Sequence, residues 1–311
     1  MTDLHVFAVY ANPQRWLSRL TNFRRFEAQI LAVGCKLTSV ELIYGDRAPE
    51  LPLRDDVLRV RLRAKDLLWH KENCLNFAAA YTPEWQACVC IDGDIHPVDP
   101  NWPTQTLLAL DIHPVVQISS ELAVLGPNGQ QISKGTSLMQ LVLNARKGGD
   151  LPPAGPYSTP MELKGHGYPG GAWAYRRETW DKLGGLLDRC IVGGADHQMA
   201  AGILNIKQAG EPSDVTPAYG RYVKAWQDRA WRRVEADIGL VEGLAVHYWH
   251  GPYKNRGYET RWKILQANDY DPYADVVQDS KGVFNLAGNK PRLRDQLRSY
   301  FTARNEDTVE L

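Results

Sequence analysis

The sequence predicts an α/β fold in which helices flank a mostly parallel sheet, and three observations support this prediction. Apolar runs of strand length recur at residues 4–10, 37–44 and 86–91. The segments between them carry apolar residues at three- and four-residue spacings, as in helices that pack one face on a sheet. Finally, 44% of the 311 residues are hydrophobic, which is ample for a substantial core.

The first half of the chain alternates strands with helices. Residues 4–10 are largely apolar and lead to Asn12-Pro13, which predicts a buried first strand followed by a loop. The next helix has its apolar face spread over residues 16–31 and stops at Gly34. The elements expected after it are strands at 37–44 and 57–62, a helix at 67–81 and a strand at 86–91.

The second half is expected to continue this pattern with one long interruption. Residues 146–171 are crowded with glycine and proline and show little periodicity, which indicates a long functional loop. The elements expected elsewhere are helices at 104–110, 195–206, 221–236, 258–266 and 291–303, and strands at 115–120 and 244–249.

Composition argues against several classes of protein. Thirty-six basic residues balance thirty-six acidic ones, so no overall charge attracts polyanions or membranes. The five cysteines lack paired CxxC spacing and lie mostly in apolar runs, which favours reduced core thiols over structural zinc. No basic leader region or membrane-length apolar stretch occurs, so we expect a soluble cytoplasmic protein. Without GxGxxG, GxxxxGK or GxSxG, dehydrogenases, P-loop kinases and serine hydrolases lose their main support.

Asp92 and Asp94 are the first candidates for a chemical site. They flank Gly93 directly after the apolar run 86–91, at the carboxyl end of an expected strand, where α/β sheets bind ligands. Gly93 permits a turn that lets both carboxylates converge on one cation. Carboxylate oxygens suit Mg²⁺ or Mn²⁺, which complete their coordination with water and substrate phosphate. The pair therefore predicts a divalent-metal site that binds the diphosphate of a nucleotide donor; the alternative is an acidic turn without a metal.

The sequence resembles the GT-A glycosyltransferases, Rossmann-like enzymes that use nucleotide-sugars and carry a DxD motif, and is most similar to the family 2 pattern. The stretch from Gly170 to Asp188 is similar to the family segment in which a small-residue turn and an arginine-bearing strand precede a helix and a Gly-Gly pair. Residues 193–197, Gly-Gly-Ala-Asp-His, are similar to its Gly-x-Glu-Asp motif. The resemblance implies a single glycosyltransferase domain, residues 1–265, with a C-terminal helical extension, residues 266–311, packed on it.

The resemblance also implies a catalytic residue and acceptor contacts. Asp196 would be the general base of an inverting transfer, taking the proton of the acceptor hydroxyl as this attacks the anomeric carbon. Ala195 stands where the family often has glutamate, so an acceptor contact made there would fall to His197. Gly171 and Trp173 are further acceptor-binding candidates. A helix-capping role for Asp196 and a core role for Trp173 stay open.

Two histidines late in the chain, His247 and His250, are metal-binding candidates. The resemblance implies that one late histidine is the third protein ligand of the metal. His250 is preferred because it precedes a Gly-Pro turn at which the chain can approach a metal, and His247 is the alternative. An imidazole ligand would favour Mn²⁺ over Mg²⁺.

The remaining candidates would hold the nucleotide-sugar. Cations beside the leaving diphosphate would stabilise the negative charge that grows as the sugar bond breaks. In the family, the end of the first strand commonly meets the base and ribose, and the first DxD aspartate meets the ribose or the metal. The donor-binding candidates are Tyr10, Asn12, Lys65, Asp92, Arg256, Tyr258 and Arg261.

The acceptor is less determined. Residues 221–233 and 253–263 interleave basic and aromatic side chains, a pattern that can hold a phosphate backbone while rings stack on bases. DNA carrying a hydroxymethylated pyrimidine, extruded from the duplex, is therefore one acceptor hypothesis. An amphipathic helix with inward-facing tryptophans explains the first pattern equally well. The alternative functions are a nucleotidyltransferase that forms nucleotide-sugars and a non-catalytic carbohydrate- or nucleic-acid-binding module.

Overall fold

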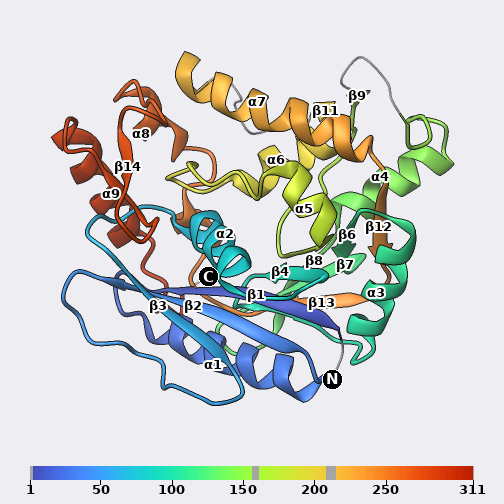
Figure 1. Cartoon of the computed structure of the whole chain (residues 1–311), viewed down its shortest axis with the longest axis horizontal. Helices are drawn as coiled ribbons and strands as arrows, with labels where there is room; N and C mark the ends of the chain where they lie inside the picture. The colour runs from blue at the N-terminus through green and yellow to red at the C-terminus, as the bar shows by residue number, and fades with distance from the viewer. Residues whose placement is uncertain (1–2, 156–160, 208–214, 311) are drawn as a thin grey trace.

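The computed structural model, which describes residues 3–155, 161–207 and 215–310, is built on a seven-stranded sheet (Figure 1). The strand order is β12-β6-β10-β4-β1-β2-β3. The strands are β1 (Leu4–Ala11), β2 (Lys36–Tyr44), β3 (Leu58–Ala64), β4 (Ala87–Ile91), β6 (Val115–Ile118), β10 (Ala172–Arg176) and β12 (Ile238–Val241). Only β10 runs antiparallel to its neighbours in this sheet, which confirms the expected mostly parallel α/β fold.

Helices cover both faces of this sheet. The period of two in β1 sends Val6 toward one core cluster and Phe7 toward the other. The helices α1 (Leu17–Ala32) and α3 (Trp102–Ile112) contribute to the first cluster. The second cluster is built with α2 (Lys71–Tyr81), α4 (Leu138–Lys147), α5 (Arg177–Leu183), α6 (Ala195–Leu204) and α7 (Pro217–Val234). Figure 1 shows α1 below the sheet and α2 above it.

A second, four-stranded sheet adjoins the carboxyl end of β4, in the order β5-β13-β7-β8. Its strands are β5 (Ile95–Pro97), β7 (Glu121–Leu125), β8 (Gln131–Thr136) and β13 (Leu244–His247). The register pairs His247 with Ile95, the residue that follows Asp94. This pairing brings the late histidines to the DxD segment although some 150 residues separate them in the chain.

The C-terminal part returns to the same core. It comprises η1 (Tyr253–Arg256), α8 (Trp262–Gln266), a hairpin of β14 (Val276–Gln278) and β15 (Phe284–Leu286), and α9 (Pro291–Ala303). Phe284, Leu293 and Leu297 join the cluster that contains α2 and α6. The segment after 265 therefore holds a β-hairpin as well as the expected helix.

The structure differs from the sequence expectation at the start of α2 and in the segment 146–171. The helix expected from residue 67 begins at Lys71, because the Trp69 amide donates to Ile191 and the His70 ring contacts the Phe284 carbonyl. The first residues of the loop expected at 146–171 belong to α4. The loop also contains the short strand β9 (Met161–Glu162), which pairs with β11 (Ile206–Lys207). Residues 156–160 of this loop lie outside the described residues. Four of the five cysteines are buried thiols.

Within the described ranges, every helix is too short or too polar to cross a bilayer.

Candidate active site

A cleft of about 740 Å³ opens at the carboxyl ends of β1 and β4. Ligands of open α/β sheets bind at such strand ends. The side chains around it come from both sheets, from α2 and α6, and from the segment after β13. Among the predicted site residues, those that line it are Tyr10, Asp92, Asp94, Gly171, Asp196, His197, His247, His250, Arg256, Tyr258 and Arg261. One cavity thus collects eleven of the fourteen candidates.

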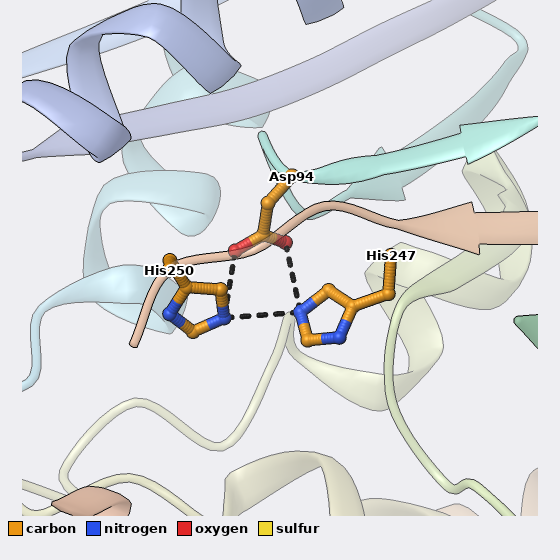
Figure 2. A group of neighbouring side chains, drawn as sticks. All are labelled: Asp94, His247 and His250. Atoms are coloured by element: carbon orange, nitrogen blue, oxygen red, sulfur yellow. Dashed lines mark hydrogen bonds and ion pairs between the residues drawn. The ribbon is translucent and has the colours of Figure 1, made fainter. Parts of the chain in front are cut away.

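Asp94, His247 and His250, which all line this cleft, form a compact cluster (Figure 2). The Nε2 atoms of the two histidines lie 3.0 Å apart. The Asp94 carboxylate lies 3.7 Å from His247 Nε2 through Oδ1 and 3.2 Å from His250 Nε2 through Oδ2. Two ligand atoms of an octahedral ion that each lie about 2.1 Å from it are roughly 3 Å apart. The three side chains therefore have the spacing of ligands to one cation, and the cluster contains both histidines, although the sequence predicted a single histidine ligand.

The charge states of this cluster fit metal binding. Burial raises the pKa of Asp94, but His250 and His247 outweigh it and hold the pKa well below its usual value. Burial and then Arg256 lower the pKa of His250 to about 4. The imidazole is therefore neutral at pH 7, which is the form that binds metals. One carboxylate with two imidazoles suits a transition-metal ion such as Mn²⁺ better than Mg²⁺.

Asp92 lies outside this three-residue cluster and is held by a lysine. Its Oδ1 lies 3.1 Å from Lys71 Nζ, and the same ammonium lies 3.5 Å from Glu72 Oε1. Burial alone would lower the pKa of Lys71, but Asp92, Glu72 and Asp196 raise it well above its usual value. Lys71 is thus a permanent cation among three carboxylates. The main chain of Asp92 is also fixed, since its amide donates to Gly171 at 2.9 Å.

Asp196 occupies the first turn of α6 and faces the cleft. Two glycines make this placement possible: a Cβ on Gly170 would collide with Asp196 Oδ2, and a Cβ on Gly194 would meet the Trp262 ring. Burial raises the pKa of Asp196, but Lys71 and then Arg261 outweigh it and leave the pKa below its usual value. The carboxylate is therefore ionised and able to accept a proton. His197, which follows it, is 8% exposed and lines the same cleft.

Glu72 lines the cleft as well, although it was not among the fourteen site candidates. It lies on α2 beside Lys71, and only 2% of it is exposed. Burial raises its pKa to about 7, against the opposing effect of Lys71. In the sequence, residues 69–73 are a weaker candidate for donor contacts, because such residues also occur on ordinary exposed helices; the packing of α2 places Lys71 and Glu72 in the cleft lining.

The two predicted arginines in the cleft act on different carboxylates: Arg256 lowers the pKa of Asp94, and Arg261 lowers that of Asp196. Arg256 is buried, donates to the Gly251 carbonyl at 3.2 Å and helps to lower the pKa of Asp94. Arg261 lies across the faces of Tyr258 and Trp262, with its guanidinium carbon 5.0 and 4.9 Å from the two ring centroids. Arg256 is therefore placed beside the metal cluster and Arg261 beside Asp196.

Three predicted residues do not line the cleft. The Asn12 side chain donates through Nδ2 to the Tyr10 hydroxyl and to the Trp16 carbonyl, and its Oδ1 accepts from the Trp16 amide. These hydrogen bonds fix the loop after β1. Lys65 is exposed, and its amide donates to Asn285 in the C-terminal hairpin. Trp173 is only 7% exposed, belongs to the core and donates through Nε1 to the Pro169 carbonyl. The core interpretation of Trp173 is the one that its packing supports.

The basic and aromatic helix α7 also lies away from the cleft lining. Trp226 is 4% exposed and donates to the Gly185 carbonyl, while Trp231 packs against the core. Arg232 and Arg233 are exposed. The helix is therefore an ordinary amphipathic one with inward tryptophans.

Aromatic side chains at the mouth of the cleft were not foreseen as a group. Tyr253 and Tyr258 have ring centroids 4.8 Å apart, and His166 and Tyr168 have centroids 6.2 Å apart. All four line the cleft, and Tyr253 is 66% exposed. They offer flat ring faces to the cleft. We call these four residues the aromatic rim.

Comparisons with known proteins found similarities to solved structures but none in sequence. No protein-family model and no curated protein matches the sequence. Over 81% of its length, the chain is similar to Staphylococcus aureus TarS in complex with UDP-GlcNAc, at 11% identity and a TM-score of 0.43, and it spans only 60% of that chain.

Two further solved structures give similar values. One is glucosyl-3-phosphoglycerate synthase from Mycobacterium tuberculosis with Mn²⁺, UDP and phosphoglyceric acid, at 12% identity and a TM-score of 0.40, over 89% of this chain and 82% of that one. The other is 4-diphosphocytidyl-2C-methyl-D-erythritol synthase from Anaerococcus prevotii, at 9% identity and a TM-score of 0.35, over 77% and 86%. At these TM-scores the similarities do not bear on function. The fold and site define an α/β protein whose cleft contains an Asp-His-His cluster with the spacing of metal ligands, and the functional argument rests on that cleft.

Proposed function

We propose that the protein is a metal-dependent glycosyltransferase that moves a sugar from a nucleotide-sugar to a hydroxyl acceptor. The observation that carries this proposal is the convergence, in one cleft, of a cluster with the spacing of metal ligands and an ionised carboxylate, Asp196. A diphosphate leaving group needs positive charge, and an alcohol nucleophile needs a proton acceptor. The cleft offers both.

Asp94, His247 and His250 would hold the divalent ion, with Mn²⁺ the best fit to their donor atoms. When bound, such an ion supplies Lewis-acid stabilisation of the charge that develops on the leaving diphosphate. Arg256, buried beside the cluster, adds a second positive charge on the same side. Tyr10, at the end of β1, would meet the nucleoside, and Asp92, held by Lys71, the ribose.

Asp196 would take the proton of the acceptor hydroxyl. In an inverting transfer, the acceptor oxygen forms a bond to the anomeric carbon while the bond from that carbon to the phosphate oxygen breaks. The electron pair leaves with the nucleoside diphosphate, and the acceptor proton moves to Asp196. Lys71 and Arg261 keep this carboxylate ionised, because they lower its pKa against the effect of burial.

The aromatic rim supports an acceptor with a flat face. A sugar ring or an extruded base stacks on tyrosine and histidine rings in this way. DNA with a hydroxymethylated pyrimidine stays the acceptor hypothesis to be tested first, although its support now comes from the rim and not from α7. His197 and Gly171 would line the path between the rim and Asp196.

The donor is tested by thermal stabilisation with UDP-, GDP-, TDP- and CMP-sugars, each with and without Mn²⁺. The proposal predicts that one nucleotide class raises the melting temperature only when Mn²⁺ is present. If no donor stabilises the protein and none is turned over, the transferase proposal is abandoned. Release of pyrophosphate from a nucleoside triphosphate and a sugar phosphate would instead identify a nucleotidyltransferase.

The acceptor is tested by incubating the protein and its donor with DNA that contains hydroxymethylcytosine. Digestion to nucleosides and mass spectrometry would then detect a nucleoside heavier by one sugar. Transfer to a free sugar or glycoside, with no change in the DNA, would assign the rim to a carbohydrate acceptor.

A further inference from the structure

The chain beyond α9 contacts the metal cluster at His250. Glu306, in this tail, is only 1% exposed. Its carboxylate forms ion pairs with Arg19, at 2.5 Å between Nε and Oε2, and with Arg304, at 2.6 Å between Nε and Oε1. A buried carboxylate that is paired with two arginines stays charged. The tail therefore places one negative charge, that of Glu306, in the protein interior.

This charge lies next to the outer nitrogen of a metal-cluster histidine. His250 turns Nε2 toward Asp94, while its Nδ1 lies 3.7 Å from Glu306 Oε2. The His250 side chain is 9% exposed, and its buried Nδ1 has no hydrogen-bond partner among the described residues. A histidine that binds a metal through Nε2 carries its proton on Nδ1, and that proton needs an acceptor.

The backbone is shaped to let the tail approach. Gly251 follows His250 with a φ of +87°, a conformation that suits glycine. A Cβ at Gly251 would lie 2.9 Å from the Glu306 Cα, too close for any other residue. Gly251 therefore permits both the positive φ of this turn and the close approach of the Glu306 backbone.

We propose that Glu306 is a positioning residue of the metal centre: it accepts the Nδ1 proton of His250 and so fixes the ring with Nε2 aimed at the ion. Carboxylates commonly orient metal-binding histidines in this way. Here the carboxylate comes from the segment beyond α9, and Glu306 itself holds this segment in place through its ion pairs with Arg19 and Arg304. The proposal rests on the metal site of the proposed function.

The test compares two neighbouring tail residues. Glu306→Gln keeps the volume of the side chain and removes its charge. The matched control is Asp307→Ala, because Asp307 anchors the same tail by accepting from the Leu17 and Ser18 amides at 2.8 Å but contacts α1 and not the histidine. Free Mn²⁺ is measured by electron paramagnetic resonance in titrations of wild type and both variants. Melting temperatures report on folding.

We expect Glu306→Gln to raise the Mn²⁺ dissociation constant at least tenfold and Asp307→Ala to leave it within twofold, even if the control melts at a lower temperature. Glu306→Asp, which keeps the charge for both arginines but shortens the reach to Nδ1, covers the case in which the glutamine variant does not fold. It should weaken Mn²⁺ binding severalfold. Unchanged affinity in the folded Glu306 variants, or equal weakening in the control, would overturn the role of Glu306 and leave the metal site standing. A wild-type protein that binds no Mn²⁺ would overturn both.

Discussion

Replacing Lys71 by methionine is expected to destabilise the protein through its three neighbouring carboxylates. The lysine Nζ lies 3.1 Å from Asp92 and 3.5 Å from Glu72, and it also lowers the pKa of Asp196. Methionine keeps most of the apolar stem but removes the charge. The carboxylates would then repel one another without a cation between them.

The size of the effect follows from partial burial. Removing one partner of a fully buried ion pair costs about 3–5 kcal/mol, whereas an exposed pair contributes about 0.2–1 kcal/mol. The Lys71 and Asp92 side chains are 23% and 33% exposed, between these limits. We therefore expect Lys71→Met to lower the free energy of unfolding by about 2 kcal/mol at pH 7 without divalent metal.

A double-mutant cycle with Asp92→Asn separates this pair from other effects. Urea unfolding, followed by tryptophan fluorescence in EDTA, gives the free energies of the wild type, both single variants and the double variant. The ion pair predicts that the double variant is more stable than the sum of the single effects by about 1 kcal/mol. Additivity within about 0.3 kcal/mol would show that the two groups do not interact and would refute the electrostatic reasoning.

Three further predictions concern the cleft walls. Asp196→Asn should retain Mn²⁺-dependent donor binding, measured by calorimetry. It should reduce the rate of transfer at least about 100-fold, since a general base accelerates a reaction by about 10²–10⁴-fold. Loss of donor binding with transfer intact would contradict the assigned role. Gly170→Ala should also impair transfer, because its Cβ would displace the Asp196 carboxylate, whereas Gly148→Ala, where a Cβ meets nothing closer than 3.4 Å, should not. Glu72, whose pKa rises from 4.5 to about 7 on folding, contributes stability that is complete below about pH 4.5 and is lost as pH rises through 7. Glu72→Gln should therefore stabilise the protein by up to about 3 kcal/mol at pH 8 and by little at pH 4.5, and a pH-independent difference in urea unfolding would contradict this.

The sequence predicted the main sheet because its strands are apolar and regularly spaced. The runs at 4–10, 37–44 and 86–91 are buried on both faces, so hydrophobicity alone marks them. The strand at 131–136, Gln-Ile-Ser-Lys-Gly-Thr, is mostly exposed and polar, and nothing in its composition predicts a strand. It forms because β7 pairs with it.

The metal cluster was predictable in part. Asp94 stands at a strand end and both histidines stand beside a glycine turn, which are local signals that survive in the fold. The ion pair of Asp92 with Lys71 was not visible, because it depends on how α2 packs against β1 and β2. Likewise, Glu306 lies in a charged terminal segment that resembles a solvated end, and only its docking shows it buried. The assignment of residues 1–265 as the catalytic domain stays a prediction.

Release of nucleoside diphosphate from the stabilising nucleotide-sugar, with Mn²⁺ and with EDTA, in wild type and in Asp94→Asn, measures the proposed chemistry directly. Wild type should release nucleoside diphosphate only with Mn²⁺, and Asp94→Asn, which loses the carboxylate shared by both histidines, should release at least about 100-fold less while remaining folded. Equal release in EDTA, or in the folded Asp94→Asn variant, would contradict a metal-dependent transferase built on this cluster.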